Sequence, residues 1–315
     1  MATASSPDGA SMLRHIVVLG SVNIDLVLHC AQLPLPGQTL TGRDFRCEPG
    51  GKGANQAVAA ARLGARVVFV GCVGDDAFGA QSAAGLRAEG VDLTHLSVIA
   101  HCATGVAMIA VEDSGQNHIV LGPGANAALS VALVEAATRA IGTAALLICQ
   151  LESPLASVER AVAIARAAGV PVWLNPAPAQ PLPEALLQQV DLLIPNEGEA
   201  ALLAGLSVQG RAAAVQAATQ LRAAGCGTVL VTLGGDGVLQ VDAHGVQHHP
   251  AQAVAAMDTT GAGDTFIGAL AAATAEGQPF EAAIAFAQRA AAFSVQRRGA
   301  QAAMPRRDDL GPSRG

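Results

Sequence analysis

Short runs of apolar residues recur along the chain at the length expected of buried β-strands. Six of these runs span residues 15–20, 67–71, 145–149, 170–174, 190–194 and 228–232. Ala-rich stretches of helical character lie between them, among others at 54–63, 154–168 and 212–224. Because buried strands that alternate with helices form parallel sheets, the pattern predicts an α/β fold with helices on both faces of a mostly parallel sheet.

Small and polar residues follow several of the predicted strands, at 20–23, 175–177, 195–197 and 232–235. The carboxyl ends of parallel strands meet at one edge of a sheet, where ligands bind in such folds. We therefore expect a ligand site that is built from these four segments.

Two stretches break the alternation of strand and helix, at about 26–46 and 105–121. Their helix signals are weak, and the second resembles two short strands around a turn at Asp113-Ser114-Gly115. We predict that both form a small β-sheet lid over the site, since lids exclude water during chemistry. The folded domain is expected to span residues 14–310, and residues 1–13 are expected to form a disordered tail.

Composition excludes several classes of protein. Hydrophobic residues make up 51% of the 315 residues and charged residues only 14%, so most of the chain must be packed. No apolar run approaches the ~20 residues of a membrane-crossing helix, and we expect no membrane association. The net charge of −7, the absence of Tyr and the lack of a basic stripe argue against binding to nucleic acid. Six scattered cysteines without a C-x-x-C pair predict reduced thiols and a cytoplasmic protein.

The strongest local signal is Asp258-Thr259-Thr260-Gly261-Ala262-Gly263-Asp264, which precedes a helix-like segment. Glycines permit a tight turn into the helix, whose first N–H groups and dipole can hold the charge of a transferring phosphate. Asp264 in the first turn could accept a proton from an attacking hydroxyl. The structural alternative is that Asp264 only caps the helix and the glycines only form the turn.

The second signal is Gly50-Gly51-Lys52-Gly53-Ala54-Asn55, which also opens a helical segment. It is not a P-loop, because Gly53 rather than Ser or Thr follows Lys52. A tight turn with an exposed Lys and an Asn suits hydrogen bonding to a polyol, and a purely structural glycine turn is the alternative.

Single polar residues at the ends of predicted strands complete the candidates. Asn23 and Asp25 offer donors and an acceptor for vicinal hydroxyls, and Glu152 would be costly to bury without a partner. Asn196 and Glu199 could orient the waters of a phosphate-bound magnesium ion. Each residue alone could be a helix cap or part of a surface loop, but all are expected at the same edge of the sheet.

Six motifs occur here in the order found in ribokinases of the PfkB sugar-kinase family. They are Asn23-Ile24-Asp25, residues 50–57, residues 150–154, residues 175–179, the pair Asn196 and Glu199, and residues 258–264. The resemblance runs from about residue 16 to residue 305. It implies a ribokinase-like three-layer α/β/α fold with a mostly parallel central sheet and a small β-sheet lid.

The resemblance also implies an activity, which is the ATP-dependent phosphorylation of D-ribose at O5. Asp264 would be the base, and Gly261, Ala262 and Gly263 would form the anion hole. The implied sugar contacts are Asn23, Ile24, Asp25, Gly51, Lys52, Gly53, Ala54, Asn55, Glu152 and Asp264. The implied nucleotide contacts are Asn196, Thr232, Leu233, Gly234, Gly235, Asp236, Gly237, Gly263, Asp264 and Gln288.

Two kinds of ion accompany such kinases. Magnesium would be held through water by Asn196 and Glu199. A monovalent cation, usually potassium, would lie beside the anion hole against Asp258, Thr260, Ser294, Arg297, Gly299 and Ala303. Ala303 departs from the Ser or Thr expected there, so one ligand is lost or replaced by water. Ile267 and Gln288 also depart from the family pattern, and we expect changed nucleotide affinity at most. The resemblance further implies a homodimer formed through the lids.

Other functions remain open from the sequence. A related kinase could act on deoxyribose, a ketohexose or a nucleoside, although nucleoside kinases usually carry more aromatic residues. A non-catalytic sugar sensor would tolerate loss of the base, yet Asp264 and its glycines are intact. A dinucleotide-binding protein would need G-x-G-x-x-G after the first strand, where residues 20–25 differ.

Overall fold

A nine-stranded sheet forms the centre of the molecule in the computed structural model, which describes residues 14–206 and 210–311. The strands follow the order β13-β12-β11-β10-β9-β8-β1-β4-β5. Their bounds are β1 Ile16–Leu19, β4 Val67–Gly74, β5 Asp92–Ile99, β8 Leu146–Cys149, β9 Val172–Leu174, β10 Leu192–Leu193, β11 Thr228–Thr232, β12 Val238–Asp242 and β13 Gly245–His249. All neighbours are parallel except β12, which is antiparallel to β11 and to β13.

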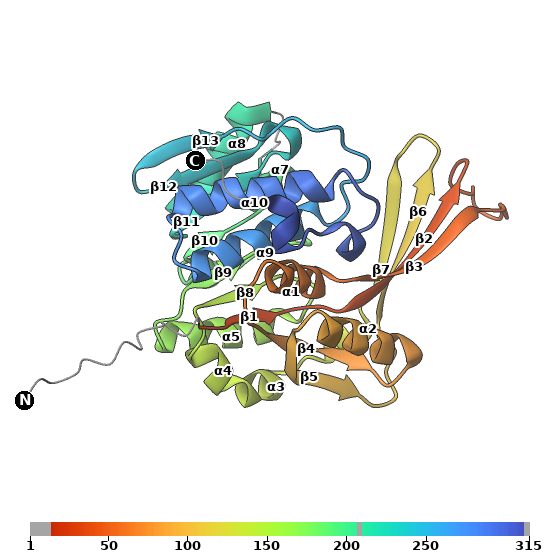
Figure 1. The fold of residues 1–315 in the computed structure, drawn as a ribbon, viewed down its shortest axis with the longest axis horizontal. Helices are drawn as coiled ribbons and strands as arrows, with labels where there is room; N and C mark the ends of the chain where they lie inside the picture. The colour runs from red at the N-terminus through yellow and green to blue at the C-terminus, as the bar shows by residue number, and fades with distance from the viewer. Residues whose placement is uncertain (1–13, 207–209, 312–315) are drawn as a thin grey trace, which may run out of the picture.

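Helices cover both faces of this sheet (Figure 1). Helices α1 (Lys52–Arg62), α9 (Ala262–Ala275) and α10 (Phe280–Ser294) bury apolar residues against one face, together with Leu86 of α2 (Ala77–Ala88). The other face is covered by α3 (Val131–Ala136), α4 (Thr138–Gly142), α5 (Leu155–Ala167), α6 (Glu184–Leu187), α7 (Glu197–Ala204) and α8 (Gly210–Ala223). Strand β1 shows why two cores form, since Ile16 and Val18 enter the first and Val17 and Leu19 the second. The predicted three-layer fold is confirmed.

All six predicted strands are present, but the structure adds others that the pattern did not reveal. Strand β5 is amphipathic and lies at the edge of the sheet, so it lacks a continuous apolar run. Strand β13 contains the polar residues His248 and His249. Main-chain pairing with β12 makes a strand out of these polar residues at the opposite edge of the sheet.

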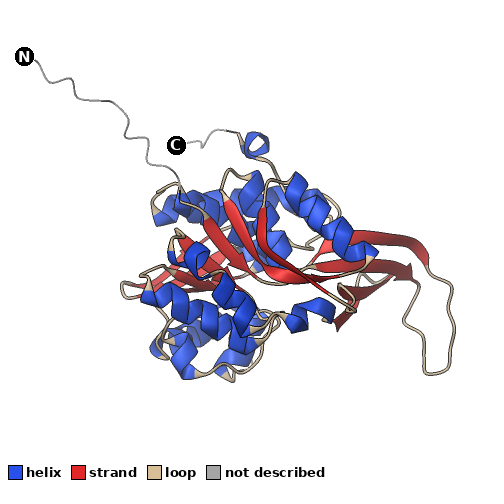
Figure 2. Ribbon diagram, turned by 90° about the horizontal axis from the view of Figure 1, so that it is seen from below, coloured by secondary structure: helices blue, strands red, loops and turns tan. Residues whose placement is uncertain are grey.

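A second sheet of four strands projects from the main body (Figures 1 and 2). Its strands are β2 (Asn23–Cys30), β3 (Arg43–Gly50), β6 (Gly105–Glu112) and β7 (Asn117–Gly122), in the order β3-β2-β6-β7. The two stretches that broke the alternation therefore form one small sheet. Strand β2 begins three residues before the predicted boundary at residue 26, so Asn23 and Asp25 lie inside it rather than in a loop after the first strand. Polar side chains at these two positions hid the start of the strand.

Residues 1–13, for which a disordered tail was expected, lie outside the described residues. Within the described ranges, no helix combines the length and the apolar character needed to cross a membrane.

Candidate active site

The segment 258–264 forms the turn into helix α9. Gly261 precedes the helix with φ of +71°, a left-handed conformation that a residue with a side chain rarely adopts. Asp264 lies in the first turn of the helix, as predicted, and is buried. The Ala262 N–H donates to the Thr259 carbonyl at 3.2 Å. The next N–H groups of the first turn, those of Gly263 and Asp264, have no acceptor within the helix and can face an anion.

Close packing of two helices brings partners to Asp264. A Cβ atom at Gly268, one turn further along α9, would lie 2.5 Å from Cβ of Ala59 and 2.7 Å from the carbonyl oxygen of Gln56. Only glycine permits this approach of α9 to α1. The glycine therefore lets side chains in the first turns of α1 reach the carboxylate.

Two amide side chains of α1 hold that carboxylate. Asn55 Nδ2 donates to Asp264 Oδ2 at 3.0 Å, and Gln56 Nε2 donates to Asp264 Oδ1 at 2.9 Å. Each amide is held in turn by another, since Gln301 Nε2 donates to Asn55 Oδ1 at 3.0 Å and Gln150 Nε2 to Gln56 Oε1 at 2.6 Å. Burial nevertheless raises the pKa of Asp264, against the lowering effects of Lys52, Asn55 and Gln56. The carboxylate is thus oriented and suited to accept a proton.

Lys52 is the first residue of α1 and is half-buried rather than exposed, contrary to the sequence interpretation. Burial alone would lower its pKa, but the pKa is raised because Asp264, Glu152, Glu199 and Asp25 surround the ammonium. The Lys52 ammonium therefore lies among four carboxylates, whose charge favours its protonated form.

Glu152 is satisfied by polar groups from three segments. Its Oε2 accepts from Ser21 Oγ at 2.5 Å, from the Lys52 N–H at 3.2 Å and from Asn23 Nδ2 at 3.4 Å. Asn126 Nδ2 donates to Asn23 Oδ1 at 2.7 Å and so sets which end of the Asn23 amide faces Glu152. The cost of burying this carboxylate is offset, as the sequence required.

Asp25 lies at the base of the small sheet, and its environment differs from that of Glu152. Within the described ranges, no donor is hydrogen-bonded to its carboxylate. Burial, the largest cause, and the charges of Glu152, Glu48 and Asp264 raise the pKa of Asp25 to about 7, although Lys52 lowers it. Because no described residue donates to it, the Asp25 carboxylate is available to accept hydrogen bonds from ligand hydroxyls.

Two adjoining cavities meet at the start of α9, where Thr232, Thr259, Ala262 and Gly263 line both; Asp264 lines the smaller one. The smaller, of about 160 Å³, is lined by Lys52, Asn175, Ala177, Ile194, Asn196, Glu199, Thr232, Thr259, Gly261, Ala262, Gly263, Asp264 and Ile267. The larger, of about 400 Å³, is lined by Thr232, Gly234, Gly235, Gly237, Val238, Ala251, Gln252, Ala253, Val254, Ala256, Thr259, Ala262, Gly263, Phe266, Gln288, Ala291, Ala292 and Val295. The start of α9 forms a wall of both.

Asn196 and Glu199 form a helix cap, which is one of the two roles that the sequence left open. The Asn196 side chain accepts from the Glu199 N–H at 2.9 Å, and Glu199 Oε2 accepts from the Asn196 N–H at 2.8 Å. This reciprocal pair caps α7. Both residues also line the smaller cavity, and burial raises the pKa of Glu199. The cap therefore fixes polar groups at the cavity wall.

The predicted cation ligands are only partly brought together. Asp258 Oδ1 accepts from Thr260 Oγ1 at 2.6 Å, and Asp258 Oδ2 accepts from the Gly299 N–H at 2.8 Å. Burial alone would raise the pKa of Asp258, but these bonds lower it. The Arg297 side chain instead lies 3.5 Å from the ring of Phe293.

Ser294 and Ala303 are buried, and Ser294 Oγ donates to the Ala291 carbonyl at 2.9 Å. At the predicted positions Arg297, Gly299 and Ala303, main-chain carbonyls are thus the groups that can be offered to a cation. Ala303 supplies no hydroxyl.

Several residues in the predicted list offer no side chain to the site. Ile24 and Ala54 are buried in the apolar core, where only their main chain could serve. Leu233 is buried and, like Asp236, lines neither of the two cavities. These side chains miss the site because a motif specifies the path of the main chain, while some of the side chains along that path point into the core.

Other residues of the site were not predicted. Gln56, Gln150 and Asn175 stood inside quoted motifs, but nothing marked their side chains as partners of Asp264. Ser21 lay in the predicted segment 20–23, but its bond to Glu152, 131 positions away, was not predicted. Asn126 carried no signal, because its contact with Asn23 joins residues 103 positions apart. The apolar wall of the larger cavity at 251–256 was also missed.

Comparison with known proteins shows the family to which the chain belongs. The model of the pfkB family of carbohydrate kinases matches residues 13–307. The chain belongs to the pfkB family of carbohydrate kinases.

Members of this pfkB family resemble the chain over nearly its whole length. The chain is 44% identical over 298 residues to a ribokinase of Haemophilus influenzae, covering 95% of this chain and 97% of that protein. It is 37% identical over 291 residues to a deoxyribokinase of Salmonella typhi, covering 92% and 95%. The structure of Arabidopsis thaliana ribokinase complexed with ribose and ATP superposes with a TM-score of 0.88 at 33% identity, covering 95% of this chain and 98% of the other.

Proposed function

We propose that this protein transfers the γ-phosphoryl group of ATP to O5 of D-ribose and so forms D-ribose 5-phosphate and ADP. The observation that carries the proposal is the place of Asp264 at the start of α9, where it lines the smaller cavity with Lys52, next to the larger, nucleotide-sized cavity. The ribokinase relatives support ribose as the acceptor.

In the proposed reaction Asp264 accepts the proton of the 5-hydroxyl as its oxygen attacks the γ-phosphorus. The bond from the γ-phosphorus to its bridging oxygen breaks, and ADP leaves. The N–H groups of Gly261, Ala262 and Gly263 stabilise the charge on the transferring group. Lys52, which lines the same cavity, adds a positive charge beside it.

Ribose would bind at the base of the small sheet. Asp25 accepts hydrogen bonds from neighbouring hydroxyls, and Asn23, Lys52 and Glu152 supply the remaining polar contacts. The main chain of residues 51–55 forms one wall of this site, and the small sheet acts as its lid. Asp25 is the residue that we expect to distinguish ribose from a sugar without the 2-hydroxyl.

ATP would lie in the larger cavity. Thr232 and the loop at 234–237 contact its phosphates and ribose, and Gln288 approaches the adenine. Gln288 Nε2 already donates to the His249 carbonyl at 2.8 Å, which holds the side chain at the cavity wall. Ile267 lines the smaller cavity instead, where its apolar side chain offers no hydrogen bond to a phosphate.

The residues present fit magnesium and a monovalent cation. Asn196 and Glu199 offer side-chain oxygens at the smaller cavity and would hold magnesium through its water ligands, several of which magnesium usually keeps. The Asp258 carboxylate and the carbonyls of residues 294–303 would hold potassium beside the anion hole. These ions supply charge neutralisation when bound. Ala303→Ser should lower the potassium concentration for half-maximal activity by about fivefold if the added hydroxyl contributes about 1 kcal/mol.

A homodimer would form through the small sheets. Met108 and Val120 are paired in register on β6 and β7 and are 60% and 67% exposed, and Phe45 on β3 is 64% exposed. Apolar side chains on a projecting sheet favour burial against a second copy. The six cysteines are free, which supports a reducing compartment such as the cytoplasm.

A coupled assay of ADP formation tests the function. We expect the highest kcat/KM with ribose in a panel that also contains deoxyribose, fructose and adenosine, and a lower rate without potassium. The deoxyribokinase relative makes deoxyribose the second candidate. Equal or better turnover of deoxyribose, or of any other sugar in the panel, would contradict the ribose assignment.

A further inference from the structure

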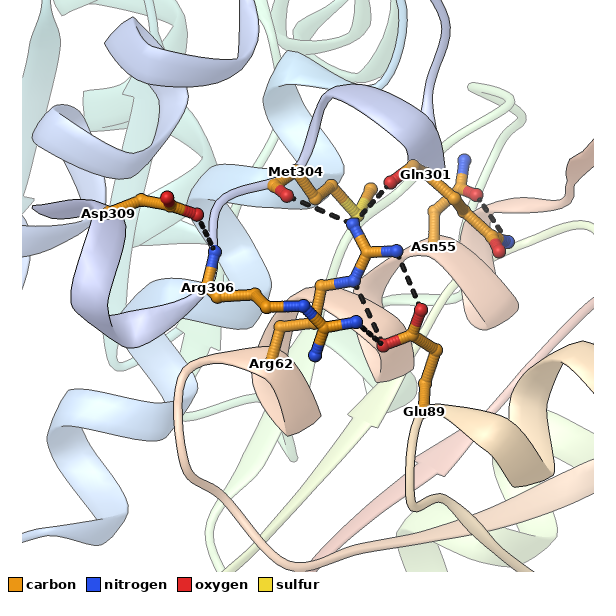
Figure 3. A network of polar contacts seen from close by, with 7 residues as sticks. All are labelled: Asn55, Arg62, Glu89, Gln301, Met304, Arg306 and Asp309. Atoms are coloured by element: carbon orange, nitrogen blue, oxygen red, sulfur yellow. Dashed lines mark hydrogen bonds and ion pairs between the residues drawn. The ribbon is translucent and has the colours of Figure 1, made fainter.

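An arginine at the far end of α1 ties the C-terminal segment to the active-site helix (Figure 3). Arg62 Nη1 donates to the carbonyl oxygens of Gln301 at 2.6 Å and of Met304 at 2.9 Å. The remaining two nitrogens donate to Glu89, with Nη2 to Oε1 at 2.7 Å and Nε to Oε2 at 3.0 Å. The Arg62 and Glu89 side chains are 13% and 17% exposed, so this clamp, formed by Arg62 with Glu89 and the two carbonyls, is shielded from solvent. Such bidentate, partly buried contacts hold both partners in one geometry.

Gln301 connects this clamp to the base. Its main-chain oxygen is held by Arg62, and its side-chain Nε2 donates to Asn55 Oδ1, as Figure 3 shows. Because the Asn55 oxygen is occupied, its Nδ2 is the end that faces Asp264. An inverted Asn55 amide would place its oxygen against the carboxylate and its nitrogen against the donor, so Gln301 selects the productive orientation.

Helical geometry explains why one residue can do this. Asn55 and Arg62 are seven residues apart on α1, which is two turns, so both side chains lie on the same face. Gln301 lies in the short helix η3 (Gln301–Ala303) and contacts both of them. The main chain of Gln301 is fixed by Arg62 at the last turn of α1, and its side chain contacts Asn55 in the first turn.

We propose that Gln301 is a positioning residue for phosphoryl transfer, which orients Asn55 toward Asp264 and is itself fixed by Arg62. The proposal rests on the proposed function, in which Asp264 is the base. It also links the base to residues 299–303, which include two of the proposed cation positions. The second amide, Gln56, is held by Gln150, which follows the end of β8. Of the two amide contacts to Asp264, the one from Asn55 therefore depends on the C-terminal segment.

Steady-state kinetics on the full-length protein test this relay of contacts, from Arg62 through Gln301 and Asn55 to Asp264. In Gln301→Ala, kcat should fall by about 5- to 10-fold, as expected for one lost hydrogen bond, with KM for sugar and ATP within about twofold. Gln301→Glu keeps the length but presents an acceptor to Asn55, and should lower kcat at least as much. Gln301→Lys keeps a donor and should restore at least half of the activity. A role in packing alone would not separate Lys from Glu.

Arg307→Gln is the matched control. Arg307 also ties the C-terminal segment to the body, through the Leu63 carbonyl at 3.2 Å and Glu276 at 2.9 Å, but does not contact Gln301 or Asn55. We expect its kcat to stay within twofold of the wild type, while Arg62→Gln should match Gln301→Ala. Equal kcat in Gln301→Ala and the wild type would overturn the proposal.

A titration separates this proposal from the sugar assignment. The Asn55 hydrogen bond lowers the pKa of Asp264, so its loss should raise that pKa. In ¹³C NMR of carboxyl-labelled aspartates, with Asp264 assigned from Asp264→Asn, the pKa should rise in Gln301→Ala and stay unchanged in Arg307→Gln. The acidic limb of the kcat profile should move the same way. This readout holds whichever sugar is phosphorylated, and an unchanged Asp264 pKa in Gln301→Ala would refute the relay.

Discussion

Two aspartates of the proposed sugar site have contrasting surroundings. Asp264 is buried at the start of α9 and accepts hydrogen bonds from Asn55 and Gln56. Asp25 is half-buried in β2 and has, among the described residues, no hydrogen-bonded donor, while neighbouring carboxylates and burial raise its pKa to about 7. The proposed base is organised before any ligand arrives, whereas the proposed sugar-binding carboxylate lacks partners that ligand hydroxyls can supply.

The difference has a physical reason. A base must keep its geometry through the reaction, so buried amides that cost no reorganisation are suitable partners. A binding carboxylate gains most from a ligand when its donors are missing in the free protein. Removing either aspartate should therefore affect different kinetic quantities.

The largest effect is expected for Asp264→Asn. The amide cannot accept the proton, so kcat should fall by roughly 100- to 10,000-fold, the usual contribution of a general base. The sugar affinity should change little, because the variant keeps the size of the side chain. Activity measured by ADP release and affinity measured by calorimetry check this, with the exposed Asp92→Asn as the control. An active Asp264→Asn would refute the assigned base.

A smaller effect is expected for Asp25→Asn, and it should appear in binding. Hydrogen bonds to a charged acceptor contribute about 1.5–3 kcal/mol, so the Kd for ribose should rise roughly 10- to 100-fold. Since the charged form binds hydroxyls better, wild-type affinity should increase as pH rises through about 7. This pH dependence should be lost in Asp25→Asn, as measured by calorimetry between pH 6 and pH 8. A wild-type Kd that is flat over that range would break the contrast between the two aspartates.

The smallest effect concerns stability without ligand. The folded protein keeps the Asp25 proton up to about pH 7, whereas the unfolded chain loses it near pH 3.8. Stability contributed by this group is therefore complete below about pH 4 and is lost as pH rises toward 7. Asp25→Asn should melt a few degrees above the wild type at pH 8, since each kcal/mol corresponds to roughly 2–4 °C, and close to it at pH 4. Scanning calorimetry at both pH values checks this, and a lower melting temperature at pH 8 would be the opposite result.

Much of the site followed from sequence because its chemistry is carried by local motifs. The turn at 258–264 fixes a helix start by its glycines, and the apolar runs fix the parallel strands whose ends carry polar residues. Both depend on neighbours in the chain, so a single sequence determines them. The start of β2 was missed, because Asn23 and Asp25 are polar and their strand pairs with segments far along the chain.

Sequence alone thus determined the α/β architecture, the helix that carries Asp264 and the edge of the sheet that carries the candidate site. Only the tertiary structure decided which side chains meet there. The contacts of Gln301 with Asn55, and of Asn126 with Asn23, join residues 246 and 103 positions apart. Hydrogen bonds between such distant residues leave no periodic pattern in the sequence, because they form only when packed helices and strands bring their ends together.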